Sequence, residues 1–226
     1  MLNLMRLELM KFKLWPVMKG SFIAILVISG VIALAMLDGE FKSYDEVFRY
    51  IDVFVKATFM IFGASLIAKF IIQEFTEKTM TVMFMYPINR KKMMIAKLFI
   101  IMIFTFLSIV ISDIVIFSLL YVVNVYYSVI TEPLTMTILL QNASKLLMNA
   151  IAATGISLIP LYFGMKKYSV RTTIVSAVII MSLLTSSLGG HYSLYDIILI
   201  PIILACVGLV VAYMTVRKIE QVDLFK

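Results

Sequence analysis

The chain has 226 residues, of which 62% are hydrophobic and 15% are charged, and its mean hydropathy is +1.05. This composition excludes an ordinary soluble domain. Six helices of about 20 residues each would also leave no room for a separate soluble domain. The net charge of +7 does not indicate a nucleic-acid partner, because in a membrane chain the distribution of the cations matters more than their total.

Residues 1–18 precede the first sustained apolar segment. Their apolar side chains recur at three- and four-residue steps, at Leu2, Met5, Leu9 and Phe12. Trp15 follows at a position typical of the lipid headgroups, where it would anchor the chain to the membrane surface. We predict a helix that lies in the membrane interface, and the alternative is a plain extension of the first membrane span.

Six apolar segments follow, and we predict that each crosses the membrane as an α-helix. Their ranges are 22–37, 51–72, 98–123, 136–164, 173–188 and 197–216. The first and the fifth are short, at about 16 residues, so flanking residues or a thinned bilayer must complete them. Residues 1–226 are thus expected to form a single transmembrane domain of an all-α membrane protein.

The orientation follows from the lysine and arginine residues. If both termini lie inside, the outer loops hold only Lys42 and Arg49, and the inner segments hold most of the other cations. Because cytoplasmic loops of membrane proteins are enriched in Lys and Arg, the sequence predicts an N-in, C-in topology.

The segment between the second and third spans, residues 73–97, is the most informative part of the sequence. It reads QEFTEKTMTVMFMYPINRKKMMIAK, in which charged and apolar residues recur at helical spacing before Pro87. This pattern predicts a short amphipathic helix that the proline ends. Basic residues then anchor the start of the third span at the anionic inner leaflet, namely Arg90, Lys91, Lys92 and Lys97. The alternative is a connecting loop that only follows the distribution of cations.

Charged residues inside a span cost about 2.5 to 3.5 kcal/mol each, so each needs a reason. Asp113 and Lys145 lie at similar depths, counted from the outer ends of the third and fourth spans. They are either an ion pair or a polar element of a translocation path, or the long Lys145 side chain reaches towards the membrane surface. Asp52 and Lys56 are four residues apart on one helix face and can pair with each other.

The sequence predicts no catalytic, cofactor-binding or metal site. The chain has one histidine, His191, and one cysteine, Cys206, so neither a disulfide nor a His/Cys metal cluster can form within it. It also lacks the G-x-x-x-x-G-K-[ST] loop that cradles the phosphates of ATP. The chain is therefore not expected to be an enzyme.

The order of these features resembles the ABC-2 type permeases, the membrane subunits of a class of ATP-driven exporters. The matching positions of the segment after the second span are Glu74, Glu77, Thr79, Pro87, Arg90 and Lys97. Lys78 stands where a glycine is common in that family. The short length and the lack of a large outer domain are similar to the small permeases of bacitracin and lantibiotic export or self-immunity in Gram-positive bacteria.

The resemblance implies that the amphipathic segment is a coupling helix, which docks on a separate ABC ATPase. The residues expected to dock are Glu74, Phe75, Glu77, Lys78, Thr79, Val82 and Tyr86. It further implies a bacterial plasma-membrane exporter, with two ATPase copies that hold ATP and Mg and a second permease subunit that is identical or related. The expected cargo is an amphipathic or hydrophobic peptide. The alternative is a channel, or a membrane-embedded sensor or scaffold, that works without ATP.

Overall fold

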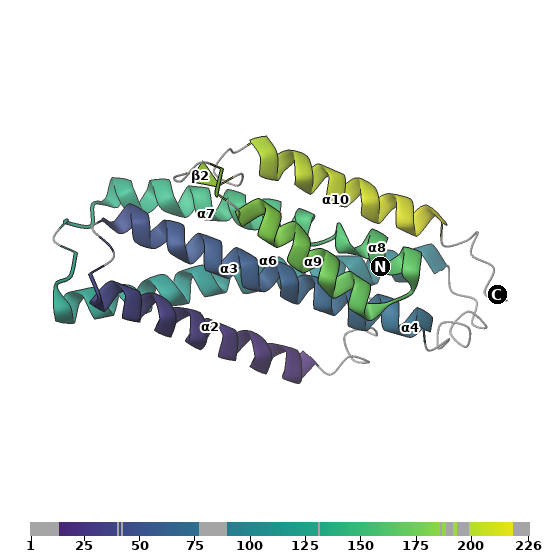
Figure 1. The fold of residues 1–226 in the computed structure, drawn as a ribbon, viewed down its shortest axis with the longest axis horizontal. Helices are drawn as coiled ribbons and strands as arrows, with labels where there is room; N and C mark the ends of the chain where they lie inside the picture. Colours follow the sequence, from purple (N-terminus) through teal and green to yellow (C-terminus); the bar gives the residue numbers. More distant parts are fainter. Residues whose placement is uncertain are drawn as a thin grey trace. The chain divides into compact units, whose positions relative to one another are not determined.

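The computed structural model describes residues 14–39, 41, 43–76, 90–130, 132–185, 187–188, 192–193 and 199–218, and these are almost entirely helical (Figure 1). Five helical stretches among them are long and apolar enough to cross a membrane: Trp15–Leu37, Tyr44–Thr76, Lys91–Tyr127, Met136–Lys167 and Leu199–Arg217. The helix Val170–Thr185 is also apolar but shorter. We conclude that the chain is an all-α, multi-pass membrane protein.

The helices and strands follow one another in a simple order. They are α2 (Leu14–Leu37), α3 (Tyr44–Ile67), the π-helix η1 (Ala68–Ile72), α4 (Gln73–Thr76), α6 (Arg90–Tyr127), α7 (Met136–Ile156), α8 (Pro160–Lys167), α9 (Val170–Thr185), β1 (Ser187–Leu188), β2 (Tyr192–Ser193) and α10 (Leu199–Lys218). The two short strands pair antiparallel. The interfacial-helix prediction falls on residues 1–13, which lie outside the described residues, and on the first turn of α2.

Several helices extend beyond the apolar runs that predicted them. The run 51–72 lies within a helix that begins at Tyr44, because Ser43 accepts a hydrogen bond from the Glu46 N–H at 3.4 Å and caps the first turn. The negative charges of Asp45 and Glu46 in that turn also interact favourably with the positive end of the helix dipole.

Two of the predicted segments differ from the helices that the structure shows. The segment 136–164 is interrupted between α7 and α8, because Pro160 lacks the N–H that would continue the α-helical ladder. The segment 173–188 is shifted, since α9 ends at Thr185 and Ser187 and Leu188 form β1.

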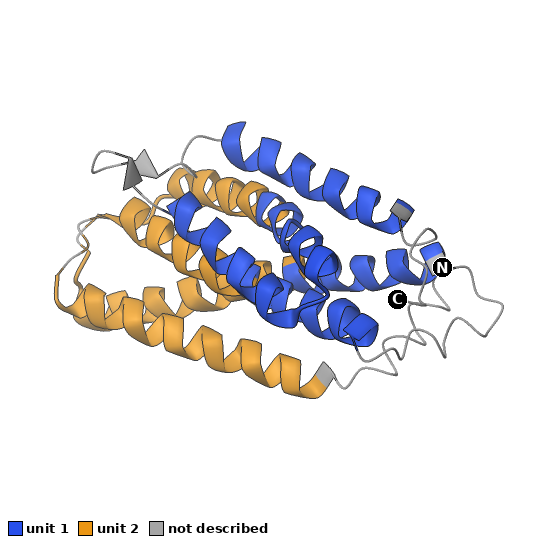
Figure 2. Cartoon of the chain, turned by 45° about the vertical axis from the view of Figure 1, so that its right-hand side comes forward, with its two compact units in different colours: residues 1–13, 60–105, 152–226 blue, residues 14–59, 106–151 orange. Residues whose placement is uncertain are grey.

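The chain divides into two compact units (Figure 2). Among the described residues, those of 60–105 and 152–218 belong to unit 1, and those of 14–59 and 106–151 belong to unit 2. The helices α3, α6 and α7 therefore each contribute to both units.

In unit 2, polar side chains join α3 to α7. The Asn142 amide donates to Asp45 Oδ1 at 2.7 Å, and the Asn149 amide donates to Asp52 Oδ2 at 2.8 Å. The two partners on each helix are seven residues apart, which is two helical turns, so they share one face. Because both residue numbers rise together, the two helices run parallel here. Phe48 of α3 stacks on Phe117 of α6, with ring centroids 4.4 Å apart.

In unit 1, glycines allow helices to approach closely. An added Cβ atom at Gly155 of α7 would lie 2.7 Å from the Cβ atom of Ala205 in α10. One at Gly208 would collide with the carbonyl oxygen of Gly155. Small residues at such crossings let backbones pack against each other in membranes. The helix α8 contacts α9, α10 and η1.

We predict that Gly208→Ala destabilises the protein by about 1–3 kcal/mol, because the new methyl group must push the α7 backbone away from α10. The measurement is thermal unfolding of the purified protein in detergent. Gly30→Ala is the matched control, since an added Cβ atom there has nothing within 4 Å and should leave stability unchanged or slightly raised. An equal melting temperature for the two variants would contradict the close contact.

Candidate functional site

A buried ion pair joins α4 to α6 in unit 1. Lys97 Nζ of α6 pairs with the carboxylate of Glu74, and their side chains are only 1% and 10% exposed. The same ammonium group donates a hydrogen bond to the carbonyl oxygen of Phe70 at 3.2 Å. Taking two charges out of water is costly, so the pair depends on good geometry and on additional hydrogen bonds.

The π-helix η1 explains how a backbone carbonyl comes to meet Lys97. In this helix the Gln73 N–H donates to the Ala68 carbonyl, five residues back, which interrupts the regular α-helical ladder. A buried carbonyl needs a hydrogen-bond partner. The Phe70 carbonyl, within η1, finds one in the lysine.

The α8–α9 turn is held against the same region. Thr76 Oγ1 lies 2.9 Å from the Ile72 carbonyl oxygen and 3.0 Å from that of Tyr168, so its hydroxyl can donate to either. Tyr168 ends α8 in the left-handed conformation, with a φ of 44°. Its ring also contacts that of Phe75, with centroids 6.2 Å apart. Glu74, Thr76, Lys97 and Tyr168 are called the junction cluster below.

The structure places two of the predicted site residues in the interior of unit 1. Glu74 was expected to present its charge to a partner, but it is buried and paired with Lys97. Lys97 was expected at the membrane surface, but α6 begins at Arg90 and so places Lys97 two turns inside the helix, where it is 1% exposed. Phe75 is half-buried. The other predicted docking residues, Glu77, Lys78, Thr79, Val82 and Tyr86, lie outside the described residues.

The remaining predicted surface anchors have different surroundings. Trp15 is 67% exposed, and Lys19 Nζ lies 5.3 Å from the centroid of its ring. Lys92 is exposed. Lys91 is half-buried and, with Arg217 of α10, lines a cavity of about 310 Å³ in unit 1. The α6 helix starts at Arg90, whose side chain lies outside the described part.

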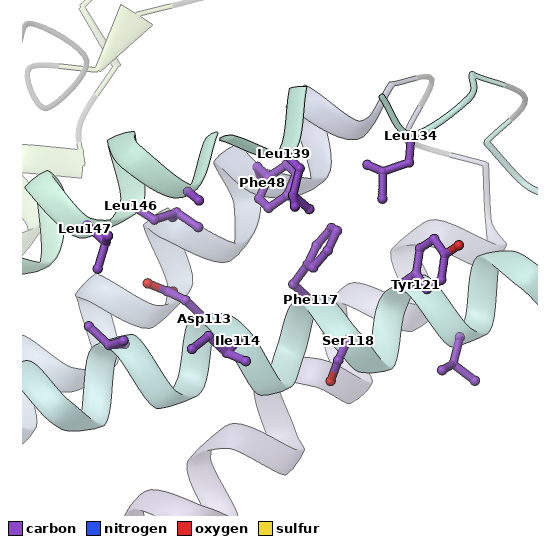
Figure 3. A pocket seen from close by; sticks show the side chains of 13 residues that line it. Phe48, Asp113, Ile114, Phe117, Ser118, Tyr121, Leu134, Leu139, Leu146 and Leu147 are labelled. Atoms are coloured by element: carbon purple, nitrogen blue, oxygen red, sulfur yellow. The ribbon is translucent and has the colours of Figure 1, made fainter. Parts of the chain in front are cut away.

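A second and larger cavity, of about 650 Å³, lies within unit 2 (Figure 3). Apolar residues of α3, α6 and α7 dominate its lining, and Asp113 is the one charged residue among those that line it. Figure 3 shows the side chains of Asp113 and Phe117 extending from α6 towards those of Leu146 and Leu139 on α7. The cavity thus combines an apolar wall with a single carboxylate.

The two intramembrane charges that the sequence placed at similar depth do not pair. Among the described residues, Asp113 is 6% exposed and forms no ion pair with Lys145, which is exposed. Asp113 interacts electrostatically with Asp52 and Lys56 instead. Similar depth does not fix the side of a helix, and α7 turns Asn142 and Asn149 towards α3, not Lys145.

Asp52 and Lys56 form the ion pair that their spacing predicted. Lys56 Nζ lies 2.5 Å from Asp52 Oδ2, and the Asn149 amide of α7 donates to the same oxygen. The spacing of the two residues does not by itself connect this pair with Asn149 or Asp113. Among the described residues, no cluster of three or more His, Cys, Asp or Glu side chains could hold a metal ion.

Comparison with known proteins identified a relative of the same size. The chain is similar to YcbO of Bacillus subtilis (strain 168), an uncharacterised protein, with 40% identity over 228 aligned positions that cover 98% of this chain and 100% of YcbO. No model of a protein family matches the sequence. No solved structure matches it either.

We predict that Lys97→Met destabilises the protein by about 3–5 kcal/mol, because it removes the buried cation that pairs with the Glu74 carboxylate. Thermal unfolding in detergent measures the effect. Adding Glu74→Leu to Lys97→Met should recover most of the loss, since both charges are then replaced by apolar groups. Lys92→Met, at an exposed position five residues earlier, is the control and should cost little. A Lys97→Met protein as stable as this control would rule out the buried pair.

Proposed function

The chain belongs to the same family as YcbO, and we propose that it is the membrane-spanning permease subunit of an ATP-driven exporter of the ABC-2 type. It works in the bacterial plasma membrane as a dimer with an identical or related permease. Two copies of a separate ATPase bind and hydrolyse ATP. The cargo is an amphipathic or hydrophobic peptide, which leaves the membrane or the cell.

The junction cluster is the observation that carries this proposal. A coupling helix must pass the motion of the ATPase to the membrane helices, so its base has to be attached firmly to several of them. The segment 77–89 follows directly after α4, in which Glu74 pairs with α6 and Thr76 reaches the α8–α9 turn. Because charges attract more strongly in a low dielectric, the buried pair resists separation when the segment is pushed.

The docking surface itself is assigned to the residues beyond this attachment. With Glu74 paired inside, we propose that Glu77, Lys78, Thr79, Val82 and Tyr86 contact the ATPase. Glu77 and Lys78 supply charge, and Val82 and Tyr86 supply apolar surface. The chain lacks a phosphate-binding loop of its own, so active transport requires such a partner.

We propose six spans with both termini inside, α9 being the fifth. The parallel course of α3 and α7 in unit 2 supports the alternation of the second, third and fourth spans, because the second and fourth must run in the same direction. The 16 residues of α9 reach about 24 Å, less than the roughly 30 Å hydrocarbon core. Local thinning of the bilayer, or residues after Thr185, must cover the difference.

Affinity purification of the tagged chain in mild detergent tests the exporter proposal directly. Mass spectrometry should find a stoichiometric ATPase with a phosphate-binding loop. Glu77→Arg combined with Tyr86→Arg should lose this ATPase while the chain still inserts. Recovery of the chain alone, under conditions that keep a control exporter whole, would favour the channel, sensor or scaffold alternative.

Thr76→Val should separate docking from coupling. The variant loses the hydrogen bond to the Tyr168 carbonyl, so we expect normal ATPase recovery but about fivefold lower resistance of expressing cells to bacitracin or a lantibiotic. Thr185→Val is the matched control, because its hydroxyl bonds only within α9 among the described residues. Full resistance with Thr76→Val would show that the junction cluster does not transmit motion from the ATPase to the membrane helices.

Single cysteines in a Cys206→Ser background test the topology. A membrane-impermeant maleimide should label cysteines at Glu132 and His191 in intact cells. Cysteines at Lys92 and Lys166 should react only after the cells are permeabilised. Labelling of positions 166 and 191 from the same side would show that α9 does not cross the membrane.

A further inference from the structure

The unit 2 cavity has the size and the lining of a ligand site. Its volume of about 650 Å³ lies within the range of about 300–1,000 Å³ that is usual for small-molecule pockets. Phe48, Phe117, Leu139 and Leu146 give it an apolar wall. Such a wall favours alkyl or aromatic groups over water.

Asp113 is the feature of this cavity that the packing of the unit leaves unexplained. Its carboxyl group is buried, and its Oδ1 atom accepts no hydrogen bond from the part of the chain that the structure describes. Buried polar atoms in native proteins almost always have a partner. Because Asp113 also lines the apolar cavity, its unpartnered oxygen points to a ligand that donates a hydrogen bond.

The neighbouring charges indicate the sign of that ligand. The charged groups that interact with Asp113 are Asp52 and Lys56, and Lys56 Nζ is already 2.5 Å from Asp52 Oδ2. Lys56 therefore already has a carboxylate partner in Asp52. A cation next to Asp113 would pair with its carboxylate, whereas an anion would be repelled by it.

We propose that this cavity binds lipophilic ammonium compounds, with the ammonium group donating to Asp113 Oδ1 and the apolar body lying between α6 and α7. The rim supports entry from the bilayer, because Ile114 and Leu147 are 63% and 48% exposed. The binding proposal rests on the cavity alone. We further propose that a lipophilic ammonium compound, or a peptide with an ammonium group, is the cargo, and this second proposal rests on the proposed exporter function.

Binding can be measured on the full-length protein in phosphatidylcholine nanodiscs. A photoreactive dodecylammonium derivative is the labelling probe, and dodecylammonium, dodecanol and dodecyl sulfate are the competitors, which share a chain length but differ in charge. We expect peptides around Asp113 to be labelled, and dodecylammonium to compete at least about tenfold better than dodecanol. Dodecyl sulfate should compete least.

Three variants assign the effect to the site. Asp113→Asn keeps the size of the side chain and should weaken competition by dodecylammonium about tenfold, leaving dodecanol unchanged. Ala143→Phe keeps the acid but fills the cavity, and should weaken both. Glu132→Gln removes an exposed acid of the same unit outside the cavity and should change neither.

The proposal is overturned if Asp113→Asn binds dodecylammonium as the natural chain does, or if dodecanol competes equally well. Should Asp113→Asn fail to fold, the charge series on the natural chain and the Ala143→Phe variant decide instead. Binding without any ATPase partner or export would refute the exporter function and leave the site in place. Export without this binding would refute the site alone.

Discussion

The buried ion pair between Glu74 and Lys97 is the interaction on which the rest of unit 1 depends. Neither charge is tolerable alone at this depth, so each fixes the position of the helix that carries the other. The pair also places the lysine where it satisfies the Phe70 carbonyl within the π-helix. The pair thereby ties α6 to the π-helical turn that leads into α4.

In unit 2, too, acidic side chains have partners. Asp45 and Asp52 of α3 accept hydrogen bonds from Asn142 and Asn149 of α7, two turns apart, and Asp52 also pairs with Lys56. Asp113 departs from this rule, since its Oδ1 atom has no such partner among the described residues. Departures of this kind are common where proteins bind other molecules, in line with the ligand site proposed for this cavity.

The sequence predicted the helical class well, because long apolar runs leave few alternatives in a membrane. It placed helix ends poorly, since the Ser43 cap lies outside the apolar run. The pairing of Glu74 with Lys97 was not predictable from spacing, because a contact between residues 23 positions apart depends on how two helices pack. The sequence correctly indicated that Asp113 is a costly charge inside a membrane span, but its depth along α6 could not show which side of the helix it occupies. The docking and cargo assignments rest on resemblance and remain predictions.

The position of the ion pair in the chain also bears on how the protein is made. Glu74 ends the second apolar stretch, and Lys97 arrives only with the next one, so the acid is synthesised before its partner exists. The inserting chain must therefore keep Glu74 in contact with water or with the insertion machinery until α6 has entered the membrane. The two helices become stable as a unit only from the moment the pair forms.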